Sequence, residues 1–195
     1  MFKEIKKCTL CGSRELSNIL DLKDQPPANS LRLSLNSKLE NIPLILCFCN
    51  SCSVPQLKHI VDEKELFSNY FWVTGTSSTA INHSNFFFNE AINKLDLNKS
   101  HVLEIASNDG TFLKPFKKSG HHVLGVDPAK NICKLANNNG VNTINEFFND
   151  DLIDSNPNLE SNFDLVIARN VLPHVKYLHS IIRGIKRTIK KEGFC

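Results

Sequence analysis

The sequence lacks long apolar runs and carries little net charge. Its 195 residues are 41% hydrophobic and 22% charged, with a formal net charge of +3. No stretch is long or apolar enough to span a membrane, and residues 1–7 lead into Cys-Thr-Leu-Cys rather than the apolar core of a signal peptide. The basic residues form no stripe with interleaved aromatics, which argues against nucleic-acid binding. We therefore predict a cytoplasmic protein with neither a membrane nor a nucleic acid as partner.

Glycine is also scarce where a nucleotide-binding turn needs it. The segment VLEIASNDGTFL, residues 102–113, predicts a strand that ends in a polar turn and continues as a helix. A dinucleotide site places glycines in such a turn because the backbone closely approaches a pyrophosphate. The corresponding positions here are Ala106, Asn108 and Gly110. S-adenosylmethionine (SAM) carries no phosphate, so the turn favours SAM over NAD. An NAD-dependent oxidoreductase is an alternative that the missing glycines argue against.

Cysteine, by contrast, is plentiful, and four of the seven cysteines form two Cys-x-x-Cys pairs. The first pair is Cys8 and Cys11, and the second is Cys49 and Cys52. Thiols stay reduced in a cytoplasmic protein, so metal binding is favoured over disulfides. Two such pairs complete the tetrahedron that Zn²⁺ takes in structural sites. We predict a structural Zn²⁺ site, with four buried or free cysteines as the alternative. Cys47 lacks the spacing of a ligand and is assigned to packing.

The pattern of apolar residues changes near residue 75. Before it, apolar runs are short and interrupted by prolines, and residues 42–48 and 54–59 are predicted as short strands. After it, strands and helices alternate, which predicts a parallel, Rossmann-like sheet with helices on both faces. We therefore predict a small zinc-binding domain over residues 1–75 and an α/β domain over residues 76–195. The expected strands are 101–106, 122–126, 141–144 and 163–168, and the expected helices are 77–97, 111–119, 129–139 and 175–191.

Polar residues follow each of these strands, at the edge where an open parallel sheet binds its ligand. Asp127 ends the second strand. At this position of such a fold, a carboxylate accepts hydrogen bonds from the hydroxyls of a ribose. Residues 145–147 follow the third strand, where a polar group and an apolar wall would flank adenine. His174 follows the fourth strand, and its imidazole titrates near neutral pH, so it is an acid or base candidate. The predicted cofactor ligands are Glu104, Ala106, Ser107, Asn108, Asp109, Gly110, Asp127, Pro128, Asn145, Glu146, Phe147 and Asn170.

Together these segments resemble the SAM-dependent C-methyltransferases that act on nucleotide-linked deoxysugars. The resemblance is carried by residues 8–12, 24–29, 43–57, 70–77, 107–111, 125–128, 145–148 and 170–174, which match family motifs in order. It implies that a proton leaves the carbon next to a sugar ketone and that the enolate-like carbon then attacks the methyl group of SAM. Tyr70 and His174 match motifs that line the substrate pocket and are the catalytic candidates. Packing at the domain junction is the alternative for Tyr70.

The resemblance also predicts that the chain is incomplete. Family members continue beyond residues 191–195 with the rest of the sheet and a C-terminal part that carries a Tyr-Glu-His motif. We therefore expect an N-terminal fragment that is inactive alone or depends on a separate C-terminal half. Without a fifth strand, residues 163–168 would be an exposed apolar edge that invites self-association. The alternative function is a zinc-ribbon and Rossmann-like binding module without catalysis.

Overall fold

A computed structural model describes residues 2–28, 30–31, 34, 36 and 40–195. Its backbone contacts divide the chain into two compact units. The N-terminal unit comprises Met1–Ser68 with Lys176–Leu178, and the sheet unit comprises Asn69–Val175 with His179–Cys195. Asn29, the last residue of the 24–29 motif, lies outside the described residues. In the part of the chain that is described, no helix has the length and apolar character needed to cross a membrane.

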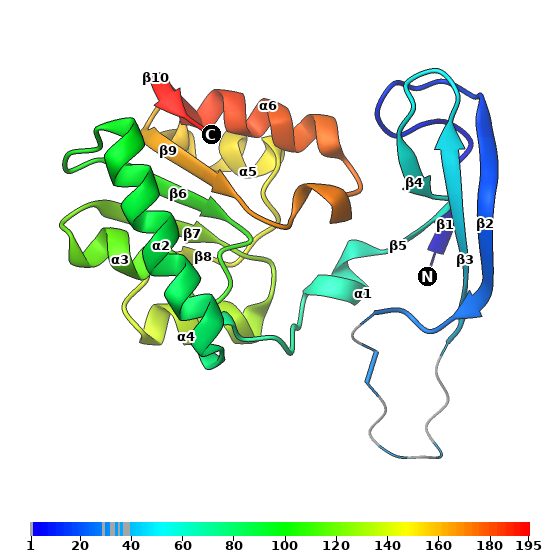
Figure 1. The fold of residues 1–195 in the computed structure, drawn as a ribbon, viewed down its shortest axis with the longest axis horizontal. Coiled ribbons are helices and arrows are strands. Elements are labelled where there is room, and N and C mark those ends of the chain that lie inside the picture. The colour runs from blue at the N-terminus through cyan, green and yellow to red at the C-terminus, as the bar shows by residue number, and fades with distance from the viewer. Residues whose placement is uncertain (1, 29, 32–33, 35, 37–39) are drawn as a thin grey trace. The chain divides into compact units, whose positions relative to one another are not determined.

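The N-terminal unit is built on a small antiparallel sheet (Figure 1). Its strand order is β2 (Leu16–Gln25), β3 (Ile42–Cys49) and β4 (Pro55–Leu57). A separate pair joins β1 (Phe2–Glu4) to β5 (His59–Val61), and the short helix α1 (Glu63–Phe67) follows. The single strand predicted over residues 54–59 is thus two strands that separate at Lys58. The sequence did not predict β2, because nearly all its side chains are exposed and its backbone pairing with β3 is what holds it.

The sheet unit is a five-stranded parallel sheet with the order β10-β9-β6-β7-β8. The strands are β6 (His101–Ile105), β7 (His122–Val126), β8 (Thr143–Ile144), β9 (Phe163–Ala168) and β10 (Ile189–Phe194). The helices are α2 (Ser78–Leu95), α3 (Leu113–Lys118), α4 (Lys130–Asn138), α5 (Asp150–Ser155) and α6 (Leu178–Thr188). The predicted Rossmann-like α/β architecture is confirmed, with β7 and β9 at their predicted bounds.

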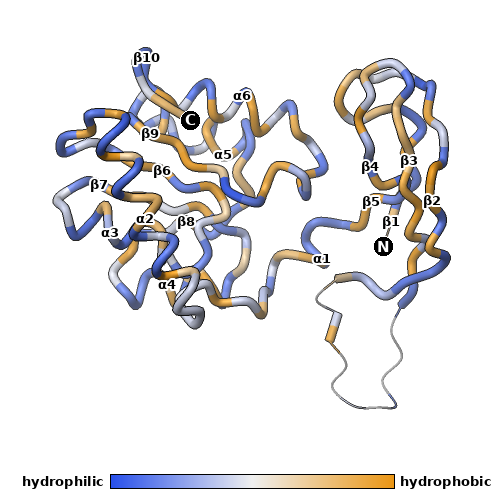
Figure 2. The backbone as a smooth tube through the Cα atoms, viewed as in Figure 1, coloured by the Kyte–Doolittle hydropathy of each residue, from blue (hydrophilic) through white to orange (hydrophobic). Residues whose placement is uncertain are grey.

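Two apolar clusters cover the two faces of this sheet, whose central strands are mostly apolar in Figure 2. Side chains alternate along a strand, so Leu103 and Ile105 of β6 join the cluster that includes residues of α5 and α6. Val102 joins the other cluster, which includes residues of α2 and α3. Glu104 therefore points to the α2 and α3 side, and this places a carboxylate beneath the turn that follows β6.

The C-terminal end of the chain differs from its prediction. The helix expected over residues 175–191 ends at Thr188, and the next residues form β10, which pairs in parallel with β9. Gly193 permits this approach, because a Cβ there would lie 2.9 Å from the Phe163 carbonyl oxygen. The prediction that residues 163–168 form an exposed edge was therefore wrong. The argument for self-association through that strand loses its basis.

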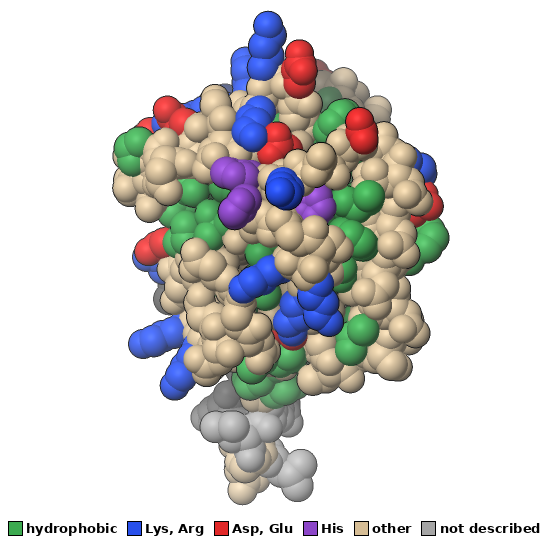
Figure 3. Space-filling view, turned by 90° about the vertical axis from the view of Figure 1, so that its left-hand side faces the viewer, with side chains coloured by type: hydrophobic (Ala, Val, Ile, Leu, Met, Phe, Trp, Pro, Cys, Tyr) green, Lys and Arg blue, Asp and Glu red, His purple; other side chains and the backbone are tan. Residues whose placement is uncertain are grey.

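The surface of the sheet unit agrees with the scattered charge of the sequence. On the face drawn in Figure 3, Lys and Arg side chains lie among acidic, apolar and uncharged ones rather than in a continuous stripe. Several basic side chains of this unit are paired, as Arg183 is with Asp150 at 2.8 Å and Lys190 with Asp164 at 2.8 Å. The absence of a nucleic-acid partner stays a prediction.

Candidate functional site

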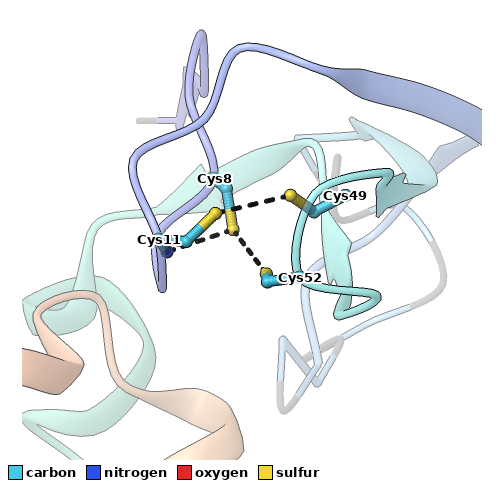
Figure 4. Close-up of side chains that lie close together, drawn as sticks. All are labelled: Cys8, Cys11, Cys49 and Cys52. Carbon is cyan, nitrogen blue, oxygen red and sulfur yellow. Dashed lines mark hydrogen bonds between the residues drawn. The ribbon is translucent and has the colours of Figure 1, made fainter.

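The two Cys-x-x-Cys pairs come together in the N-terminal unit. Their four sulfur atoms lie within 4.8 Å of one another, and Figure 4 shows the side chains converging from two turns. The closest pairs across the turns are Cys8 with Cys52, at 3.7 Å between sulfurs, and Cys11 with Cys49, at 3.6 Å. Four thiols at this spacing fit one tetrahedral Zn²⁺ and leave no ligand position open. The cluster therefore suits a structural metal rather than a catalytic one.

The two turns share one backbone design. The residue after each pair, Gly12 or Ser53, has a left-handed φ of +76° or +60°. Its N–H donates to the carbonyl of the first cysteine, at 3.0 Å to Cys8 and 2.8 Å to Cys49. Each turn thus presents both of its sulfurs on one side. Short-range geometry, rather than burial in a large core, forms the metal cage.

Hydrogen bonds prepare Cys8 to bind a cation. Burial opposes ionisation of this thiol, but the Cys11 N–H and the Gln56 amide donate to its sulfur and lower its pKa to about 6. The Gln56 side chain is oriented by Thr9, whose N–H and hydroxyl both donate to Oε1 at 2.9 Å. Cys47 is fully buried, and its sulfur donates to the Gln56 carbonyl oxygen, so it lies outside the cluster.

The turn after β6 keeps the backbone of a glycine-rich loop with only one glycine. Ala106, Asn108 and Gly110 have φ values of +53°, +51° and +75°. Only Gly110 is also sterically required, because a Cβ there would lie 2.7 Å from the Val141 side chain. Ala and Asn adopt the left-handed conformation at a cost of about 1–2 kcal/mol per residue, and Asn is the more tolerant of the two.

The Asn108 side chain holds a neighbouring stretch of the chain. Its Oδ1 accepts from the Thr74 N–H at 2.8 Å, and its Nδ2 donates to the Trp72 carbonyl at 3.0 Å. Asn131 in α4 pairs in the same way with Tyr70, accepting from its N–H at 3.1 Å and donating to its carbonyl at 2.7 Å. Residues 70–77, here called the strap, are thus held over the turn by two amide side chains. The sequence did not single out Asn131, because the contact spans 61 residues.

Asp127 joins the turns that follow β6 and β7. It is buried, and its two oxygens accept from the backbone N–H groups of Asn108 and Ala129, each at 2.9 Å. Burial raises the pKa of this carboxyl. From the turn after β8, Asn145 Nδ2 donates to the carbonyls of Asp127 and Pro128 at 3.1 and 2.9 Å. Three predicted strand-end turns are therefore tied into one group at the carboxyl edge of the sheet.

Asp109 faces the strap instead. A Cβ on Gly75 would lie 2.5 Å from its Oδ2, and its Oδ1 accepts from the Thr111 hydroxyl at 2.7 Å. A cavity of about 380 Å³ lies beside it, lined by residues of the strap, α2, α3 and α4 that include Lys114 and Lys118. This carboxylate packs the strap against the turn, so its predicted role as a cofactor ligand stays a prediction.

Glu104 makes an ion pair that the sequence did not predict. Its side chain is fully buried, and Oε1 accepts from Nη2 and Nε of Arg169 at 2.7 and 3.2 Å. Burial raises the pKa of Glu104 to about 7, against the opposite effect of the guanidinium. The guanidinium carbon of Arg169 lies 3.1 Å from the ring centroid of Phe112. In the sequence, the one sign of this ion pair was an arginine that directly follows an apolar strand.

The remaining predicted residues lie on the loops around this group. Asn170 and His174 follow β9, and both have exposed side chains. Glu146 is exposed and Phe147 is partly buried after β8, while Tyr70 is partly buried in the strap. Ser107 is buried in the turn, and a Cβ on Gly125 would lie 2.3 Å from its Oγ. The roles of these residues stay predictions.

Both units match known domains. A family model described as "Putative zinc binding domain" matches residues 8–67, and one described as "Methyltransferase domain" matches residues 103–195. The PH0226 protein of Pyrococcus horikoshii has a solved structure that is 18% identical with a TM-score of 0.53, over 67% of this chain and 62% of that chain. The chain has a class I SAM-dependent methyltransferase fold. The predicted cofactors, SAM and a structural Zn²⁺, are confirmed as those of the two domains.

A curated relative aligns with nearly the whole chain. The C-methyltransferase NovU of Streptomyces niveus is 26% identical over 194 residues, which is 98% of this chain and 46% of that protein. The chain therefore spans about half the length of the curated relative. The residues at the sheet edge fit SAM, because two buried polar atoms there, Glu104 Oε2 and Ser107 Oγ, have no protein partner among the described residues.

Proposed function

We propose that this methyltransferase transfers a methyl group to a carbon atom of a nucleotide-linked keto-deoxysugar. The observation that carries the proposal is the alignment of nearly the whole chain, cysteine pairs and sheet together, with a protein named as a C-methyltransferase. SAM, when bound, supplies the methyl group. A carbon acceptor must first be made nucleophilic, and loss of a proton next to a ketone gives an enolate that meets this need.

The chain offers residues for each part of this task. The carboxylate of Asp127 would hold the ribose of the cofactor from the turn after β7, and residues 145–147 would flank its adenine. His174, exposed after β9, would move the proton of the sugar. The Tyr70 hydroxyl, on the strap, would donate to the enolate oxygen and stabilise its charge. We propose that the remaining sugar-binding groups come from a C-terminal half, because the chain aligns with only 46% of the relative.

The test is calorimetric titration of the zinc-loaded chain with S-adenosylhomocysteine, the product of methyl transfer, with NADH as the comparison ligand. We expect saturable binding of S-adenosylhomocysteine and none of NADH, because Ala106 and Asn108 would crowd a pyrophosphate. Binding of NADH alone, or no binding of either by a chain that circular dichroism shows to be folded, would contradict the proposal.

A further inference from the structure

One glutamine connects the two cysteine turns of the N-terminal unit. Gln56 lies in β4, which follows the second turn, and its backbone pairs with Cys47 of β3. Its side chain reaches the first turn, where Oε1 accepts hydrogen bonds from the N–H and the hydroxyl of Thr9, both at 2.9 Å. Nε2 of the same amide donates to the sulfur of Cys8 at 3.2 Å. A strand that follows one turn thus contacts a ligand atom of the other turn.

The contacts with Thr9 determine which way the Gln56 amide faces. A backbone N–H can only donate, so the atom it meets must be the amide oxygen, and the nitrogen must face Cys8. Among the described residues, Gln56 is the one side chain other than a cysteine that donates to a sulfur of the cluster. Its amide is therefore directed at a metal ligand by groups outside the cluster.

A hydrogen bond to Cys8 has two effects on metal binding. The sulfur belongs to a buried side chain, so a donor there stabilises the negative charge that the sulfur carries as a ligand. The bond also fixes the direction of the sulfur before a metal ion arrives, which lowers the entropy lost on binding. Groups that hold metal ligands in this way change metal affinity by about 10–100-fold.

A second side-chain link between the turns is not directed at a sulfur. The Ser51 hydroxyl lies within hydrogen-bonding distance of Ser13 Oγ, at 2.7 Å, and of Glu15 Oε2, at 2.9 Å. Loss of this hydroxyl would loosen the same pair of turns without removing a donor to a ligand. The chain therefore contains its own control for a purely structural role of Gln56.

We propose that Gln56 is a positioning residue of the zinc site, whose amide N–H holds the Cys8 sulfur, stabilises its negative charge and so raises the affinity of the four-cysteine cage for Zn²⁺. Gln56 acts through Cys8 and does not itself bind the metal. This inference concerns the N-terminal unit alone, so its outcome is independent of the proposed methyl transfer.

The test measures the Zn²⁺ affinity of the full chain by competition with a chromophoric chelator. Gln56→Glu keeps the shape and the oxygen that accepts from Thr9, but it lacks the N–H donor. Gln56→Met also lacks the donor and carries no charge, so it separates loss of the bond from repulsion by a carboxylate. We expect both variants to bind Zn²⁺ at least about tenfold more weakly than the wild type. Ser51→Ala should stay within about threefold, because it removes no donor to a ligand.

Cobalt provides a readout that a purely structural role would not change. Co²⁺ can replace Zn²⁺ at the four cysteines, and its sulfur-to-metal charge-transfer absorption depends on the electron density at the sulfurs. An N–H donor withdraws electron density from the Cys8 sulfur, so its loss in Gln56→Met should move this absorption to longer wavelength. The absorption of Ser51→Ala should coincide with that of the wild type.

Zinc affinity and the cobalt spectrum together decide the inference. Gln56 variants that bind Zn²⁺ as tightly as Ser51→Ala would overturn it. Weaker binding with an unchanged cobalt absorption would also overturn it, because Gln56 would then be only a structural link between the turns.

Circular dichroism of the zinc-loaded chain checks that each variant is folded. Where the Gln56 variants do not fold, Thr9→Ala decides by the same two measurements, since it removes one of the two donors that orient the amide. It should bind Zn²⁺ more weakly than Ser51→Ala and shift the cobalt absorption to longer wavelength. A Thr9→Ala chain that matched Ser51→Ala in both measurements would contradict the role of Gln56.

Discussion

Asn108 shows how a single residue adapts a nucleotide-binding turn to another purpose. It occupies a left-handed position at which a glycine is expected, and it tolerates that conformation better than most residues. Its amide then makes two hydrogen bonds to the strap that a glycine could not make. Gly110 has no such freedom, because Val141 fills the space where its Cβ would lie. One turn thus contains a left-handed position where an asparagine side chain adds contacts and another where the neighbouring Val141 leaves room only for glycine.

Gly110→Ala should therefore destabilise the sheet unit. The added methyl group meets Val141 at 2.7 Å in a backbone with φ of +75°, so we expect a loss of about 2–4 kcal/mol in the free energy of unfolding. Urea denaturation followed by circular dichroism measures it. Gly120→Ala is the control, because its φ of +87° is similar but nothing lies within 4 Å of the added Cβ. It should cost only about 1–2 kcal/mol. Equal losses would show that Val141 is not the constraint.

At the scale of elements, the strap depends on side chains rather than on a strand partner. Asn131 in α4 and Asn108 in the turn pair with its backbone at Tyr70, Trp72 and Thr74. The strap also carries the proposed enolate-stabilising Tyr70 next to the proposed cofactor turn. If the strap loosened, Tyr70 would shift relative to the turn, so the order of the strap affects the geometry of the proposed reaction.

Asn131→Ala should loosen the strap while the sheet remains folded. The substitution removes both hydrogen bonds to Tyr70, and Trp72 is the only tryptophan of the chain, so its fluorescence reports on the strap alone. We expect lower fluorescence anisotropy of Trp72 and an unchanged far-ultraviolet circular dichroism spectrum. Asn138→Ala, at an exposed position of the same helix, should change neither. An anisotropy that stays at the wild-type value would mean that Asn108 and packing suffice to hold the strap.

At the scale of the whole molecule, the two units depend on different interactions. The N-terminal unit has few buried side chains in its long hairpin, whose β2 strand is largely exposed, and its four cysteines converge at one point. The sheet unit has two apolar clusters, one on each face of its sheet. Metal binding should therefore stabilise the first unit, whereas hydrophobic burial stabilises the second.

Zinc removal should consequently unfold one unit and spare the other. In the Cys49→Ser variant we expect loss of bound zinc and rapid amide hydrogen exchange in β3, with slow exchange kept in β6 and β9. Mass spectrometry of peptides after exchange measures both regions. Cys47→Ser, two positions before Cys49 and outside the cluster, should retain about one zinc per chain, because the Cys47 sulfur donates to the Gln56 carbonyl instead. Loss of protection in both units on zinc removal would show that they fold together.

The sequence by itself determined the features that depend on neighbouring residues. The spacing of Cys8 with Cys11 and of Cys49 with Cys52 predicted the metal cage, because each turn is closed within six residues. The apolar runs of β7 and β9 predicted those strands, since a buried parallel strand must be apolar on both faces. Gly120 and Gly140 follow the ends of α3 and α4, and both have the left-handed φ values that glycine adopts most readily.

Only the tertiary structure decided the contacts between distant residues. The residues of β10 resemble the end of a charged helix, and they become a strand because β9 offers an unpaired edge that Gly193 can approach. Arg169 meets Glu104 across 65 positions, and Asn131 meets Tyr70 across 61. No local pattern encodes such pairs, because their partners are chosen by the parallel register of the sheet and by where its turns converge.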